Sequence, residues 1–78
     1  MFKMTKGILQ KNEGERYDLI DQEGNVITYF TSGDLIGIYN GDKWIKGRIE
    51  YNHDFNDYYF YNPSGRHIRL YDGMKARI

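Results

Sequence analysis

Residues 33–62 read GDLIGIYNGDKWIKGRIEYNHDFNDYYFYN, and this stretch decides the fold class. Apolar and polar residues alternate in three short runs, the pattern of strands with one buried face. Between the first two runs, Asn40-Gly41 is a favoured pair for a tight hairpin turn because both residues tolerate positive φ. We therefore predict three antiparallel strands in a meander, the central part of a small β-barrel.

The rest of the 78-residue chain continues this pattern. Alanine occurs once and glycine nine times, and no window keeps apolar residues at helical spacing. Turn clusters at residues 12–14, 22–25 and 62–65 separate further short runs. Strands are expected at residues 7–10, 16–21, 26–30, 35–39, 43–51, 57–62, 67–70 and 75–78. The prediction is one all-β domain over residues 1–78, a partly open SH3-like barrel with an N-terminal β-hairpin extension.

The expected turns also predict a register. A turn at Asn40-Gly41 places Ile36 opposite Ile45, and a five-residue loop after residue 51 places Ile49 opposite Tyr59. Because side chains alternate along a strand, one face is then the core candidate. It collects Ile36, Ile38, Ile45, Ile49, Tyr59 and Tyr61. The other face collects Tyr39, Trp44, Lys46, Arg48, Glu50, Tyr58 and Phe60. A slip of one residue would exchange the two sets.

Composition excludes several classes of protein. The chain has no cysteine, which rules out disulfides and cysteine-ligated zinc and favours a reducing, cytoplasmic location. No apolar run is long enough for a signal peptide or a membrane span, so no membrane role is expected. Eleven basic and eleven acidic residues give zero net charge, whereas phosphate-driven nucleic-acid binding usually needs a basic patch. The two halves of the chain differ mildly in net charge, which is −2 over residues 1–40 and +2 over residues 41–78.

The chain contains the short motifs Gly33-Asp34, Gly41-Asp42-Lys43-Trp44, Arg48-Ile49-Glu50 and the terminal Ala76-Arg77-Ile78. Together these motifs resemble a small family of uncharacterised bacterial proteins, found mostly in Gram-positive genomes and their mobile elements. The resemblance covers most of the chain from Gly7 onward and implies a small bacterial protein with no assigned activity. The pattern is also similar to SH3-like barrels, which often place a 3₁₀ turn where this chain has Leu70–Gly73. Neither resemblance implies a substrate, because a fold does not fix a function.

Catalytic and metal-binding motifs are missing from the sequence. There is no cysteine nucleophile, no Gly-x-Ser-x-Gly elbow and no phosphate-binding glycine loop, so no enzyme is expected. Asp54 and Asn56 alternate as at the start of a calcium loop, but the required glycine and distal glutamate do not follow. His53 and His67 lack metal-ligand spacing. We expect residues 51–57 to be a connecting loop and expect no metal or cofactor.

The mixed aromatic and basic face around Trp44 is the best candidate site. Trp44, Lys46, Arg48, Tyr39, Tyr58 and Phe60 are its predicted binding residues. Trp, Tyr and Arg are enriched at protein–protein hot spots, which favours a non-catalytic module that holds a protein partner. Trp44 would be the anchor, with Lys46 and Arg48 as the charged rim.

Three alternatives remain for this face. Aromatic and basic groups on one sheet face also suit single-stranded nucleic acid, with Arg66, Arg69, Lys75 and Arg77 contributing. The protein could instead be a structural or self-associating element, because open edge strands permit pairing between copies. We expect a monomer or a weak homo-oligomer. Finally, residues 1–30 could fold over the face as a second layer and bury Trp44.

Overall fold

The computed structural model describes residues 5–78, and within this range the chain forms eight β-strands and no helix. The strands are β1 (Lys6–Lys11), β2 (Tyr17–Ile20), β3 (Val26–Tyr29), β4 (Leu35–Tyr39), β5 (Trp44–Asn52), β6 (Asp57–Tyr61), β7 (His67–Arg69) and β8 (Lys75–Arg77). Each lies within one or two residues of its predicted position. The prediction of an all-β fold is confirmed.

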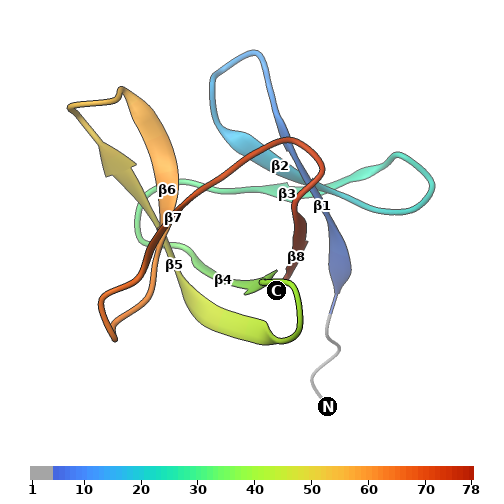
Figure 1. The fold of residues 1–78 in the computed structure, drawn as a ribbon. Helices are drawn as coiled ribbons and strands as arrows, with labels where there is room; N and C mark the ends of the chain where they lie inside the picture. Colours follow the sequence, from blue (N-terminus) through green and yellow to red (C-terminus); the bar gives the residue numbers. More distant parts are fainter. Residues whose placement is uncertain (1–4) are drawn as a thin grey trace.

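All eight strands belong to one antiparallel sheet with the order β3-β2-β1-β8-β4-β5-β6-β7. The sheet curls around a central core, and β8 lies between the N-terminal meander β1–β2–β3 and the meander β4–β5–β6–β7 (Figure 1). No strand pairing joins β3 to β7 in the described part of the chain, so the sheet is not closed into a barrel. The expected 3₁₀ turn is instead a β-turn, in which the Met74 amide donates to the Tyr71 carbonyl oxygen.

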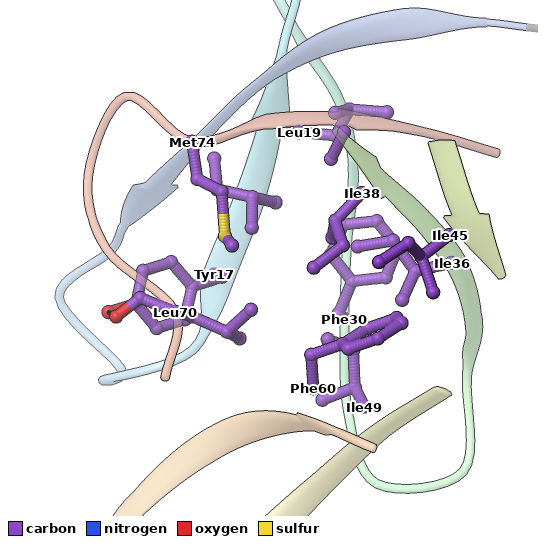
Figure 2. Close-up of a cluster of buried hydrophobic side chains, with 12 residues drawn as sticks. Tyr17, Leu19, Phe30, Ile36, Ile38, Ile45, Ile49, Phe60, Leu70 and Met74 are labelled. Carbon is purple, nitrogen blue, oxygen red and sulfur yellow. Dashed lines mark hydrogen bonds between the residues drawn. The ribbon is translucent and has the colours of Figure 1, made fainter. Parts of the chain in front are cut away.

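One hydrophobic core fills the inside of the curl, and both meanders contribute to it (Figure 2). Its buried members are Leu9, Tyr17, Leu19, Phe30, Ile36, Ile38, Ile45, Ile49, Phe60, Leu70, Met74 and Ala76. Inside the core, the Tyr17 hydroxyl donates a hydrogen bond of 3.2 Å to the Leu70 carbonyl oxygen. Residues far apart in the sequence therefore bury one shared apolar volume, the main stabilising term for a domain of this size.

The first hairpin turn lies one residue further along than predicted. The Asn40 amide donates to the Lys43 carbonyl oxygen, which makes Gly41-Asp42 the centre of the turn, and Gly41 has a φ of 79°. Ile38 consequently pairs with Ile45, so the predicted pairing of Ile36 with Ile45 is wrong by two residues. A shift of two keeps every side chain on its face. The predicted assignment of side chains to the two faces of β4 and β5 is therefore confirmed.

The second hairpin differs from the prediction by a single residue, with a larger effect. Asn52 pairs with Asp57 across a four-residue loop, and the Asn52 side-chain oxygen accepts the amides of Asp54 and Phe55. Ile49 therefore pairs with Phe60 instead of Tyr59. A shift of one residue turns the whole strand over. The face assignment of β6 was wrong.

The reversal of β6 corrects four residues. Phe60, predicted as a binding residue, is 0% exposed in the core, and Tyr58 is half-buried against the core. Tyr59 and Tyr61, predicted in the core, lie on the opposite face of β6, where Tyr61 pairs with Arg48 and Tyr59 with Glu50. The ring of Phe60, not that of Tyr61, lies against Gly47.

Candidate functional site

The side of the sheet away from the core carries the predicted aromatic and basic residues. We call this side of β8, β4 and β5 the outer face; its members are Lys75, Arg77, Leu35, Gly37, Tyr39, Trp44, Lys46, Arg48 and Glu50. Cross-strand pairing groups them, because Tyr39 pairs with Trp44, and Leu35 with Arg48. Gly37 pairs with Lys46 on one side and Arg77 on the other. Four cations and one carboxylate therefore share a surface of a chain with zero net charge.

Trp44 is half-buried at the strand end, and cations of this chain lie over its ring. The guanidinium carbon of Arg77 lies 4.3 Å from the Trp44 ring centroid, and Nζ of Lys6 lies 5.9 Å away. Tyr39 meets the indole edge-on, with ring centroids 5.4 Å apart. Residues 5–30 do not form a second layer over this face, because β1 to β3 extend the same sheet. Trp44 thus holds two cations in place.

Arg48 is held in a similar way on the other side of β4. Its Nε donates to Oε2 of Glu50 at 2.5 Å, and its guanidinium carbon lies 4.7 Å from the Tyr61 ring centroid. His67 continues the layer, with its ring 5.2 Å from Tyr59 and 5.1 Å from Tyr61. Stacking on the aromatic rings restricts the side chains of Arg48 and Arg77 before any ligand binds, which lowers the entropic cost of binding.

A hollow of about 500 Å³ lies on the outer face between these two stacked arginines. We call it the β4 groove; its lining is Leu35, Ile36, Gly37, Lys46, Gly47, Arg48, Pro63, Arg77 and Ile78. Gly37 allows the side chain of Arg77 to cross β4 beside the groove, since a Cβ atom there would lie 3.2 Å from Cγ of Arg77. The size is in the range of roughly 300–1,000 Å³ that is typical of ligand clefts.

The turn between β6 and β7 forms one wall of the β4 groove. The Asn62 side-chain amide donates to the Lys46 carbonyl oxygen at 2.8 Å, and its Oδ1 accepts the Ser64 amide at 2.7 Å. The Gly65 amide donates to the Asn62 carbonyl oxygen, which closes the predicted turn with Pro63 in its second position. Asn62 thereby brings Pro63 to the groove.

The structure brings together four of the six predicted binding residues, namely Tyr39, Trp44, Lys46 and Arg48. Tyr58 and Phe60 lie on the core side of β6 instead. The groove also contains Arg77, which the sequence reasoning named only for nucleic-acid binding, and three residues that it missed: Leu35, Pro63 and Ile78. One signal was available, because Leu35 alternates with the core residue Ile36 and so had to face outward. Pro63 carried no such signal, since turn residues follow no strand alternation, and Ile78, predicted in the last strand, lies one residue beyond the end of β8.

The other basic candidates named from the sequence do not all lie on the outer face. Lys75 and Arg77 join the outer face, whereas Arg69 lies on β7 with its guanidinium carbon 5.1 Å from the Phe55 ring centroid. Among residues 5–78, no three His, Cys, Asp or Glu side chains gather where they could hold a metal ion. No helix in the same range is long and apolar enough to cross a membrane.

The fold and this surface define a small all-β domain whose curled sheet presents a basic, partly apolar outer face. The chain matches the family model "Domain of unknown function (DUF5348)" over residues 6–78, and it belongs to this family. No curated protein matches the chain, and neither does any solved structure.

Proposed function

We propose that this protein is a non-catalytic binding module that holds a protein partner on its outer face. The observation that carries the proposal is the β4 groove, an apolar hollow set among the cations Lys46, Arg48 and Arg77. Leu35 is 78% exposed and Ile78 is 45% exposed beside it. Protein interfaces combine such an apolar centre with a polar rim in which arginine is enriched.

In this proposal the aromatic residues act chiefly by fixing cations. Trp44 holds Arg77 and Lys6, and Tyr61 holds Arg48. Rings already covered by cations of the same chain offer less surface for stacking with a nucleic-acid base. That arrangement favours a protein partner over single-stranded nucleic acid, although both would meet the same positive charge.

The test is to capture partners with the immobilised protein from an extract of the cells that produce it. The complex is then reconstituted from the protein and the purified partner. Lys46→Glu reverses a charge on the rim of the groove and should weaken the reconstituted complex at least tenfold. Arg16→Glu makes the same charge change at an exposed position in the β1–β2 turn and should leave affinity unchanged. Equal affinities for both variants and the unchanged protein would refute the proposal.

Nucleic-acid binding is the second candidate, favoured by the excess of cations on the outer face. Phosphate contacts release counterions, so affinity would fall steeply as salt rises, whereas an apolar protein interface gives a shallow dependence. A titration with single- and double-stranded oligonucleotides at two salt concentrations separates the candidates. Saturable, salt-sensitive binding that Lys46→Glu removes would put nucleic acid first.

A further inference from the structure

We propose that the β4 groove receives one large apolar side chain from an extended acidic segment, whose carboxylates on either side pair with Arg77 and with Lys46 and Arg48. This inference rests on the proposed function and adds the chemistry of the partner. It follows from three properties of the groove: its apolar lining, the placement of its charges, and the absence of a carboxylate partner for Arg77 and Lys46 among residues 5–78.

The apolar lining calls for an apolar occupant. Leu35, Pro63 and Ile78 supply apolar walls, and the side chain of Arg77 crosses above Gly37. Leu35 stands more exposed than any other large apolar residue in the described range. Burying such surface against an apolar side chain is favourable in proportion to the area removed from water.

The cations stand at both ends of the groove. Arg77 crosses β4 above Gly37, and its guanidinium carbon lies 4.3 Å from the ring centroid of Trp44 on β5. Arg48 follows four residues after Trp44 on the same strand, which is roughly 13 Å along it. An extended segment that lies along β5 covers the same distance in four residues. Acidic residues before and after one apolar residue would therefore reach both ends.

These cations are also free to pair with a partner. The ion pairs found among residues 5–78 are Lys11 with Asp57 and Arg48 with Glu50. Arg77 and Lys46 have no carboxylate partner in this range, and Arg48 uses only its Nε for Glu50. Guanidinium groups bind carboxylates through two parallel hydrogen bonds, and stacking has already oriented both arginines. Charge complementarity thus selects an acidic segment.

The probes are three synthetic peptides with blocked ends: EEDFDEE, the variant EEDSDEE without the apolar side chain, and the uncharged variant QQNFNQQ. Each is titrated into isotope-labelled protein, and amide chemical shifts are followed by NMR. We expect EEDFDEE to shift residues Leu35, Gly37, Lys46, Arg48 and Arg77. Both variant peptides should bind at least tenfold more weakly, because each lacks one of the two required features.

Two protein variants locate the binding. Gly37→Val places a side chain where Arg77 crosses β4, changes no charge, and should weaken EEDFDEE at least tenfold. Gly14→Val adds the same side chain at an exposed position in the β1–β2 turn, outside the groove, and should leave the affinity unchanged. Both variants are first checked for folding by the dispersion of their amide spectra.

The outcomes separate this inference from the proposed function. If none of the peptides binds while Lys46→Glu still weakens binding of the captured partner, the acidic segment is refuted as the ligand of the groove. The proposal that the outer face binds a protein partner is then retained. Equal binding of EEDFDEE and EEDSDEE would refute the apolar pocket. An oligothymidine that shifts the same residues at lower concentration than EEDFDEE would overturn the acidic segment in favour of nucleic acid.

Discussion

Gly47 has no side chain because the core passes directly beneath it. A Cβ atom at this position would lie 2.5 Å from Cζ of Phe60 and would overlap the Tyr61 carbonyl oxygen. Gly37 faces the other way, and a Cβ there would meet only the flexible side chain of Arg77 closely, at 3.2 Å. The two glycines on neighbouring strands thus have different roles: one makes room for the core, the other for the side chain of Arg77.

We expect Gly47→Ala to lower the free energy of unfolding by about 2–3 kcal/mol, since Phe60 is fully buried and must leave its position. Urea denaturation followed by Trp44 fluorescence measures this loss. Gly37→Ala is the matched control and should cost less than about 1 kcal/mol, because Arg77 can move toward solvent. Equal losses in the two variants would show that Phe60 does not limit space at Gly47.

At the scale of single elements, loop length decides which side chains a strand presents. A one-residue difference in the β5–β6 loop puts Phe60 in the core and Tyr61 beside Arg48. The β6–β7 turn positions a groove residue. The Asn62 side chain donates a hydrogen bond to the Lys46 carbonyl oxygen, which holds Pro63 at the groove. Hairpin loops therefore shape the candidate site although they supply few of its charges.

Asn62→Ala should lower the free energy of unfolding by about 0.5–1.5 kcal/mol through lost hydrogen bonds, and should also weaken binding at the β4 groove. Asn52→Ala is the matched control. Asn52 closes the β5–β6 loop in the same way, through amides of Asp54 and Phe55, but lies outside the groove. Thermal unfolding and titration with EEDFDEE measure the two effects. A loss of affinity in both variants would mean that general loosening, and not the position of Pro63, is responsible.

At the scale of the whole molecule, β1 pairs with β8, and the titratable side chains of Lys11 and Tyr17 add contacts between the N-terminal meander and distant parts of the chain. Nζ of Lys11 lies 3.1 Å from Oδ1 of Asp57, and this hydrogen-bonded pair raises the pKa of Lys11 above its usual value. Burial raises the pKa of Tyr17, whose hydroxyl donates to Leu70. Both groups hold their protons more firmly in the folded state, so the stability they add is present below their unfolded pKa values, near 10, and is lost as pH rises through the folded values.

We therefore expect the melting temperature to fall between pH 9 and pH 11, and Tyr17→Phe to make that fall shallower. At pH 7 the same variant should be less stable by about 0.5–1.5 kcal/mol, because the Leu70 carbonyl oxygen loses its donor. Scanning calorimetry at several pH values measures both effects. Tyr29→Phe removes an exposed hydroxyl and should match the unchanged protein at pH 7. An unaltered alkaline slope in Tyr17→Phe would contradict the role of this buried hydroxyl.

The sequence by itself determined the strands, the turns and the faces of β4 and β5. These features depend on local patterns, such as the alternation around Ile36 and Ile38 and the turn residues near Gly41. Only the tertiary structure decided the register of the hairpins and the face of β6, since one residue of loop length reverses a strand. It also placed β8 between β1 and β4, which brings Arg77 across Gly37 to the ring of Trp44 and into the lining of the groove. Pairing between strands so distant in sequence depends on how the whole core packs, and no local pattern encodes it.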